Sequence, residues 1–299
     1  MKNLWNDVDA KTFKDDLALR VYTSRLLGQD STLVLHGGGN TSVKITETNI
    51  VGEQEEILYV KGSGWDLVSI EKAGFSPVRM AHMIKLGKLD SLSDPQMVNE
   101  LKTQLTNASA PAPSVETILH AILPFKYVDH THADAVVTIS NTSNGEERIR
   151  EIYGDRVVIV PYVMPGFDLS KDVGRLFSEQ ATDKTEGMVL LNHGIFSFGD
   201  NAKQAYDRMI NLVDLAEKYL INQNAWELEK PLGGLSTKPM RNEIAQLRQS
   251  ISAVITSPVL FNLTNSERGI DFSNQDDVTS LATRGPVTPD HVIRTKRIP

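Results

Sequence analysis

Short apolar segments typical of β-strands alternate with segments of helical periodicity along residues 1–224, and this alternation constrains the fold more than any other feature. A chain of this pattern forms layers, because helices cover the apolar faces of a sheet. The segments expected as strands are 32–36, 41–45, 56–60, 127–132, 156–160 and 187–191. The segments expected as helices are 11–27, 77–87, 95–105, 114–123 and 201–222. We therefore expect a layered α/β domain over residues 1–224.

Two glycine turns each follow an expected strand directly. GGGN occupies 37–40 between TLVLH and TSVKI, which predicts a hairpin-like antiparallel pair, and KGSG occupies 61–64 after EILYV. Either turn alone is explained as a structural turn. Side-chain donors accompany both turns: Asn40, Thr41, Lys61 and Ser63. Two such loops, with glycines that let backbone N–H groups face inward, favour a pocket for a phosphate group.

The residue composition of the chain changes from about residue 225. PLGGLSTKP is typical of a linker, 241–256 has the pattern of a helix, and GPVTPDHVIRTKRIP is rich in turn residues. We expect residues 225–299 to form an accessory segment packed on the core. The ending RTKRIP is also compatible with one module of a longer polypeptide.

Composition limits the partners of the chain. The formal net charge of −7, without a basic block, argues against a nucleic-acid partner. No window approaches the apolar length of a membrane span, and the polar, acidic N-terminus lacks the layout of a signal peptide, so we expect a cytoplasmic protein with no membrane partner. The chain has no cysteine, which excludes disulfides, thiolate nucleophiles and cysteine-based zinc sites. A soft metal would have to be held by histidine and carboxylate.

Three histidines are candidate ligands for such a metal. His130 and His132 lie two apart on an expected strand and so point to the same face. His193 follows the apolar run GMVLL, at the point where a buried strand should end. Each feature also has a plain structural explanation, as unconnected surface histidines or as a hydrogen-bonded strand end. Three converging imidazoles would form a catalytic zinc site with one open position.

A carboxylate precedes the histidine pair in the segment PSVET. Ser114 is expected as a helix N-cap, which would place Glu116 in the first turn, where free N–H groups favour a negative charge. Glu116 either offsets the helix dipole or serves as a general base. Its position between a possible anion loop and the histidine strand makes it the leading candidate for the base.

The motifs GGGNTS, KGSG, PSVET, HTH and NHG together, in this order from about residue 15 to about 222, resemble the class II aldolase/adducin family. The longer wording HGGGNTSVK, VKGSGWDL, VDHTHADAV and PDHVIRTK is similar to a narrower branch. That branch includes the aldolase half of bifunctional rhamnulose-phosphate aldolase/alcohol dehydrogenases. The resemblance implies a three-layer α/β/α fold around a central mixed, largely antiparallel sheet.

The resemblance also implies roles for particular residues. Zn²⁺ or another divalent metal would be bound by His130, His132 and His193, with Glu116 as the catalytic acid/base. The phosphate of the substrate would be received by Gly39, Asn40, Ser63, Gly64 and Ser114. The family pattern implies a homotetramer whose active sites lie at subunit boundaries. Two departures concern the substrate: Val115 stands where family aldolases have a second serine, and Lys61 stands where a threonine is usual.

The function that this resemblance implies is a zinc-dependent aldolase. Such an enzyme would cleave a rhamnulose- or fuculose-like ketose 1-phosphate to dihydroxyacetone phosphate and an aldehyde. An epimerase, dehydratase or decarboxylase would use the same metal site with different acid/base placement, and a non-catalytic adducin-like binding protein would keep the fold without the metal.

Three other residues have structural interpretations that compete with functional ones. His120 lies one turn after Glu116 and is expected to pack within its helix. Asp134 would either orient a ligand histidine or cap a helix. His291, in the tail, is not expected to reach the site.

Overall fold

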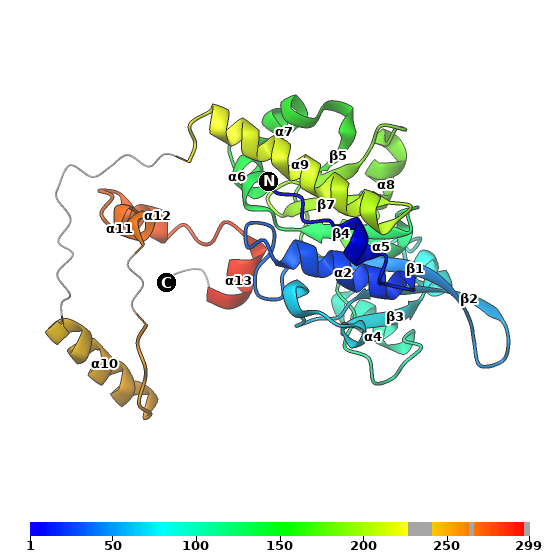
Figure 1. Ribbon diagram of the computed structural model, residues 1–299, viewed down its shortest axis with the longest axis horizontal. Helices are drawn as coiled ribbons and strands as arrows, with labels where there is room; N and C mark the ends of the chain where they lie inside the picture. The colour runs from blue at the N-terminus through cyan, green and yellow to red at the C-terminus, as the bar shows by residue number, and fades with distance from the viewer. Residues whose placement is uncertain (227–240, 263–265, 296–299) are drawn as a thin grey trace. The chain divides into compact units, whose positions relative to one another are not determined.

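The computed structural model describes residues 1–226, 241–262 and 266–295. Its centre is a seven-stranded sheet with the order β3-β2-β1-β4-β7-β6-β5 (Figure 1). The strands are β1 (Asn40–Thr48), β2 (Gln54–Lys61), β3 (Phe75–Arg79), β4 (Tyr127–Thr131), β5 (Val157–Val160), β6 (Gly187–Leu190) and β7 (Gly194–Gly199). All neighbouring pairs are antiparallel except β5 and β6, so the expected mixed, largely antiparallel sheet is confirmed.

Helices cover both faces of this sheet and complete a three-layer α/β/α fold. One buried apolar cluster joins α2, α6, α7 and α9 to one face, and two others join α3, α4, α5 and α8 to the other. In Figure 1, α2 and α9 run side by side in front of the central strands. The helices of this unit are α1 (Asp7–Ala10), α2 (Asp16–Gly28), α3 (Met80–Leu86), α4 (Asp94–Thr103), α5 (Thr117–Ile122), α6 (Asp134–Ser140), α7 (Gly145–Tyr153), α8 (Phe167–Gln180), α9 (Ala202–Asn222) and α13 (Pro289–Thr295).

The central strand β4 determines which side chains can meet. It lies between β1 and β7, with Asn40 opposite His130 on one side and Phe196 opposite it on the other. Side chains alternate between the two faces of a strand. His130 therefore faces the layer of α5 and α8, whereas its neighbour Thr131 faces α9, where its hydroxyl contacts the sulfur of Met209.

The segment 32–36 is not a strand, so the hairpin predicted around GGGN is wrong. Leu33 and Val34 are buried in the core as expected of apolar residues, but the backbone turns: Leu33 N–H donates to Asp30 O. His36 and Gly37 have φ of 44° and 87°, values that a strand cannot hold. The partner of β1 is instead β2, through a hairpin at residues 49–53.

Other boundaries also differ from the sequence-based expectation. The helix expected at 77–87 is a strand followed by a shorter helix, β3 and α3. The segment GIFSFG, for which the sequence predicted no element, is strand β7 and pairs with both β6 and β4. The helix expected at 11–27 begins only at Asp16, where the Asp15 carboxylate accepts from Ala18 N–H and caps it. Helix α9 agrees with the expected 201–222.

The chain divides into two compact units. The first holds residues 1–223 and the segment that begins at Pro286, and the second holds the residues between. The helices of the second unit are α10 (Arg241–Ile255), α11 (Glu267–Ser273) and α12 (Val278–Ala282). The predicted linker PLGGLSTKP lies outside the described residues. Of residues 225–299, which we expected to form an accessory segment, those from Pro286 to Thr295 belong to the first unit. Among the described residues, no helix is long and apolar enough to cross a membrane.

A fully buried ion pair joins α2 to β4, the strand that carries His130. Arg20 Nη2 lies 2.6 Å from Asp129 Oδ1, and both side chains are 0% exposed. We expect Arg20→Ala to lower the free energy of unfolding by about 3–5 kcal/mol, because Asp129 is left as an unpaired buried charge. Denaturant unfolding measures this. Arg150→Ala, which breaks the exposed pair with Glu146, is the control and should change stability by less than about 0.5 kcal/mol; equal effects of the two substitutions would contradict the prediction.

Candidate metal centre

His130 and His132 meet at the C-terminal end of β4. His130 is on the strand and His132 is one residue beyond it, and their exposed fractions are 0% and 7%. The two Nε2 atoms lie 3.1 Å apart. The ring of His130 stacks on Phe196 of β7, with 4.1 Å between ring centroids, which fixes its orientation. The face shared by the two imidazoles was expected from the spacing of one residue between them.

His193 reaches the same point from the turn between β6 and β7. Asn192 makes this turn with φ of 60°, and Gly194 follows. A Cβ on Gly194 would stand 2.4 Å from Thr131 O and 3.0 Å from His130 Cε1, so glycine is required for the turn to approach β4. One ligand atom from each of the three histidines lies within 4.8 Å of the others. The predicted convergence of the HTH and NHG motifs is thus present.

The protonation of the first two histidines follows from their outer hydrogen bonds. His130 Nδ1 lies 3.1 Å from Ile195 O, and His132 Nδ1 lies 2.5 Å from Asp290 Oδ1. Each of these acceptors requires an N–H, so we assign the proton of both rings to Nδ1. Both Nε2 atoms then present lone pairs to each other. Burial lowers the pKa of His130 well below its usual range and also lowers that of His193, which favours neutral rings.

Glu116 closes the fourth side of this cluster. Its Oε2 is 3.6 Å from His130 Nε2 and its Oε1 is 3.7 Å from His193 Nε2, with the side chain almost fully buried. The residue is the N-cap of α5, which begins at Thr117 rather than at 114. Ser114 instead accepts from Glu116 N–H at 3.3 Å, so it shapes the turn before the helix. Glu116 Oε1 has no hydrogen-bond partner in the described chain.

A relay of hydrogen bonds orients Glu116 from behind. Asn40 Nδ2 donates to Glu116 Oε2 at 2.5 Å, and Asn40 Oδ1 accepts from His120 Nε2. His120 Nδ1 in turn accepts from the Ser42 hydroxyl at 2.8 Å. Burial lowers the pKa of His120 to about 3, so the ring stays neutral and its single proton lies on Nε2. His120 is therefore more than a packing residue: it fixes the amide of Asn40, which fixes the carboxylate.

These donors fit a divalent cation such as zinc. Three imidazoles with facing nitrogen atoms are a known zinc ligand set, and cysteine is not needed for it. Two lone pairs 3.1 Å apart, beside a buried carboxylate oxygen without a donor, require a positive charge between them. The outer hydrogen bonds to Ile195 O and Asp290 are those that metal-binding histidines make.

Four of the seven residues expected to bind substrate lie in two groups around the cluster. Asn40 donates to Ser114 Oγ at 3.2 Å and touches Glu116. Ser63 and Gly64 are exposed in the second glycine loop, which pairs with the segment before Ser114 through Ser63 N–H and Ala112 O. The backbone N–H groups of Gly38, Gly62 and Ser63 donate to carbonyl oxygens of the chain. These three N–H groups are therefore not free to hold an anion.

Lys61 is a buried cation near the carboxylates of the site. Its side chain is 3% exposed, and Nζ donates to Gly37 O at 2.8 Å. Burial lowers the pKa of Lys61 to about 8, although the negative charges of Asp66, Asp290 and Glu116 oppose this shift.

Two of the expected substrate contacts have another explanation. Thr41 points to the face opposite Asn40, where its fully buried hydroxyl pairs with Ser24 Oγ at 2.8 Å, so the expectation that its side chain binds substrate is wrong. Gly39 has φ of 59°, and a Cβ there would stand 2.7 Å from His130 O. Close approach of the loop to β4 therefore accounts for this glycine without a phosphate.

Asp290 is the residue at the cluster that the sequence interpretation missed. It arrives from α13, 158 residues beyond the histidine that it contacts. For Asp134, the candidate from the sequence, burial raises the pKa, and the hydrogen bond to His132 Nδ1 is made by Asp290 instead. His291 bonds to Thr288 rather than to the ligand set. The motif PDHVIRTK contained the signal, because it carries a carboxylate in a segment with no other assigned role.

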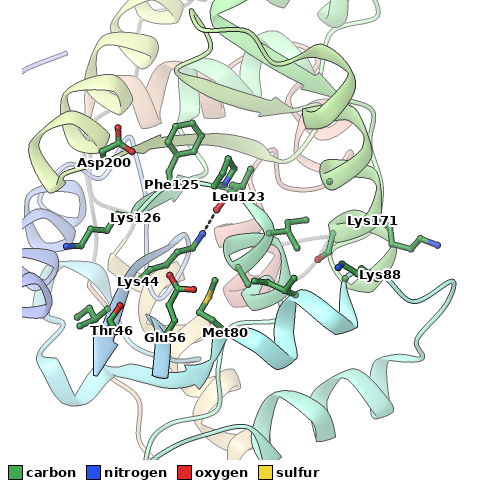
Figure 2. A pocket seen from close by; sticks show the side chains of 18 of the residues that line it. Lys44, Thr46, Glu56, Met80, Lys88, Leu123, Phe125, Lys126, Lys171 and Asp200 are labelled. Atoms are coloured by element: carbon green, nitrogen blue, oxygen red, sulfur yellow. Dashed lines mark hydrogen bonds between the residues drawn. The ribbon is translucent and has the colours of Figure 1, made fainter. Parts of the chain in front are cut away.

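A separate cavity of about 1080 Å³ lies at the opposite end of β4. Figure 2 shows the Lys44 ammonium of β1 bonded to Leu123 O, with Lys126 and Asp200 at the rim. Burial lowers the pKa of Lys44 to about 8. No histidine lines this cavity among the described residues, so its chemistry is separate from that of the metal centre.

Two family models match, one over most of the first unit and one over the C-terminal part of the chain. A model of the class II aldolase and adducin N-terminal domain matches residues 18–220, and one of the aldolase class II second domain matches residues 238–299. The chain is 34% identical over 309 residues to the uncharacterized oxidoreductase YuxG of Bacillus subtilis. That match covers 100% of this chain and 44% of the relative, so the chain spans less than half of that protein.

Solved structures agree with this assignment. The N-terminal class II aldolase domain of a conserved protein from Thermoplasma acidophilum is 45% identical, with a TM-score of 0.68, over 74% of this chain and 99% of that one. A sugar-phosphate aldolase from Thermotoga maritima has a TM-score of 0.51 at 15% identity, over 70% of this chain and 95% of that one. The second likeness concerns the fold alone.

The buried ammonium of Lys61 should destabilise the fold at neutral pH. Its pKa in the folded chain is about 8, below the usual 10.5, so the unfolded chain holds this proton more tightly. We expect Lys61→Met to raise the free energy of unfolding at pH 7 by about 1–3 kcal/mol. The gain should shrink between pH 8 and 10.5, as the wild-type lysine loses its proton. Denaturant unfolding at several pH values checks this, and a gain independent of pH would contradict the assigned cause.

Proposed function

Because the chain belongs to the class II aldolase and adducin family, we propose that it is a divalent-metal-dependent aldolase, a carbon–carbon lyase. The proposed substrate is a rhamnulose- or fuculose-like ketose 1-phosphate, cleaved to dihydroxyacetone phosphate and an aldehyde. One observation supports this most: three buried imidazoles surround a carboxylate whose Oε1 has no partner in the described chain. A metal alone would need only the imidazoles, whereas a proton transfer beside it needs the carboxylate.

The ligand set would be His130, His132 and His193. When bound, a divalent cation would polarise the substrate ketone and stabilise the negative charge that develops as the carbon–carbon bond breaks. The chain's own contribution is to hold the three rings oriented in a buried site. Stacking of His130 on Phe196 and the outer hydrogen bonds of His130 and His132 supply that orientation.

Glu116 is the proposed acid/base. Asn40 holds Oε2, so Oε1 is the oxygen that can exchange a proton with the substrate. In the cleavage direction, the hydroxyl that becomes the aldehyde carbonyl would lose its proton to water, and the electrons of the broken carbon–carbon bond would stay with the dihydroxyacetone phosphate fragment. Protonated Glu116 would then deliver a proton to the carbon that lost its bond and be reprotonated from water. In the synthetic direction, the same oxygen removes this proton.

We place the substrate phosphate nearer the second glycine loop than the first. Gly38, in the first loop, lies against the Asp290 carboxylate, and a second anion there would be repelled. The second loop offers the exposed Ser63 and Gly64, with the cation Lys61 at its start. Ser114 and Asn40 would connect this pocket to the reacting end of the substrate.

We also propose that the protein assembles as a homotetramer with active sites at subunit boundaries. Val115, between Ser114 and Glu116, is 44% exposed, which suits an apolar contact with a neighbouring chain beside the site. Light scattering of the purified protein would give the mass of the assembly, and a monomer would contradict this proposal.

The nature of the product distinguishes the related activities. An epimerase, dehydratase or decarboxylase could use the same histidines with a different proton path. Incubation with a panel of sugar phosphates, followed by product identification, separates them: aldolase activity releases dihydroxyacetone phosphate and an aldehyde. A non-catalytic adducin-like role is disfavoured by the complete set of three histidines and Glu116.

Removal of one ligand should abolish metal binding and cleavage together. We expect His132→Ala to lose bound zinc and cleavage of rhamnulose 1-phosphate or fuculose 1-phosphate. Metal analysis of protein purified without added zinc, with a dihydroxyacetone phosphate assay, measures both. His82→Ala is the control, because His82 pairs with Glu100 at the surface, and it should change neither. An active, metal-free His132→Ala protein would refute the mechanism.

Substitution of Glu116, the proposed acid/base, should slow cleavage without loss of metal binding. We expect Glu116→Gln to lower kcat by about 10²- to 10⁴-fold, because the amide cannot transfer the proton, while zinc stays bound. Steady-state kinetics and metal content measure the two effects. Unchanged kcat would remove Glu116 from the proton path.

A further inference from the structure

The C-terminal segment of the first unit contributes one carboxylate, that of Asp290, to the metal centre. Asp290 is 3% exposed, and its Oδ1 accepts from His132 Nδ1 at 2.5 Å. Its Oδ2 accepts from Leu35 N–H at 2.7 Å, in the loop that precedes β1. Figure 1 shows α13 beside this loop. One side chain therefore joins three segments of the chain that are far apart in sequence.

The absence of a side chain at Gly38 leaves room for the Asp290 carboxylate. A Cβ on Gly38 would stand 1.5 Å from Asp290 Oδ1 and 2.2 Å from its Cγ, so any other residue would collide with Asp290. The φ of Gly38 is not among the positive values of the chain, so the backbone itself tolerates alanine. The need for glycine at this position thus arises from Asp290.

We propose that Asp290 is a positioning residue of the metal centre: it clamps His132 to the loop that precedes β1 and holds the Nε2 atom of His132 toward the metal. The inference rests on the metal site of the proposed function. The hydrogen bond fixes both the tautomer and the ring rotation of His132, and the negative charge increases the basicity of the nitrogen that binds the cation. Because Leu35 N–H anchors Oδ2, the carboxylate is itself fixed, so the ring cannot turn without breaking its bond to Oδ1.

The proposal also gives the C-terminal segment a specific role. His130 donates its outer hydrogen bond to the sheet itself, to Ile195 O. His132 lies beyond the end of β4, where no strand neighbour is available, and its outer partner comes from α13. The segment from Pro286 onward would thus complete a metal centre whose ligands all belong to residues 1–223.

The first test measures zinc affinity in the full-length chain by competition with a chromophoric chelator. Asp290→Ala should bind zinc about 10- to 100-fold more weakly than wild type. Asp290→Asn, which keeps an acceptor for His132 without the charge, should fall between the two. Asp134→Asn is the matched control, because Asp134 is a partly buried aspartate two residues after His132, and it should stay within about twofold of wild type.

A spectroscopic readout separates positioning from loss of folded protein. The His132 Nδ1 proton, donated to a buried carboxylate, should give an exchange-protected low-field resonance in ¹H NMR. It should be present in wild type and Asp134→Asn, and absent in Asp290→Ala. This signal does not require metal or substrate, so it tests the clamp even where the proposed activity fails.

Gly38→Ala provides the second, steric test. It should displace Asp290 and weaken zinc binding by a similar factor, while in an Asp290→Ala background it should add little, since the obstacle is gone. Independent, additive losses would overturn the clamp. Folded Asp290→Ala protein with wild-type zinc affinity and an unchanged low-field resonance would also overturn it. A wild-type chain that binds no divalent ion would overturn the metal site itself.

Discussion

The site depends on one constraint: two imidazole nitrogen atoms lie close together in the buried interior. His130 and His132 face each other with Nε2 atoms 3.1 Å apart, both pinned through Nδ1. Without a cation this arrangement is unfavourable, because buried acceptors lack donors. The surrounding fold must therefore hold the rings against their mutual repulsion. It does so with a central strand, a stacked phenylalanine and a glycine that lets the next turn come close.

The two oxygens of Glu116 are treated differently by the fold. The chain Ser42–His120–Asn40 secures Oε2, and each link is buried and has its proton placed by its neighbour. Oε1 is left without a donor in the described chain. This division is useful for proton transfer, because one oxygen sets the position of the carboxylate while the other remains available. It depends on strand β1, whose alternation puts Asn40 and Ser42 on one face and Thr41 on the other.

The central strands bring the histidines together, and contacts from segments distant in sequence then hold them in place. Arg20 from α2 neutralises Asp129 beneath the histidines, and Asp290 from α13 reaches His132 from the far end of the chain. Both contacts bury charge, and both are possible only after the layers have assembled. The substrate side is less constrained by such contacts: Ser63 and Gly64 remain exposed in a loop.

The sequence by itself determined the layered class, most strands and long helices, and the three histidines with Glu116, because periodicity and strand-end position are local properties. It also indicated the family through motifs whose order is visible without coordinates. Tertiary structure alone decided that 32–36 turns rather than pairs, since burial of Leu33 and Val34 does not reveal where their backbone hydrogen bonds go. It likewise decided that Thr41 faces α2, that His120 acts through Asn40, and that Asp290 serves His132. Such contacts depend on the register between strands and on the path of a distant segment, and neither is encoded in local spacing.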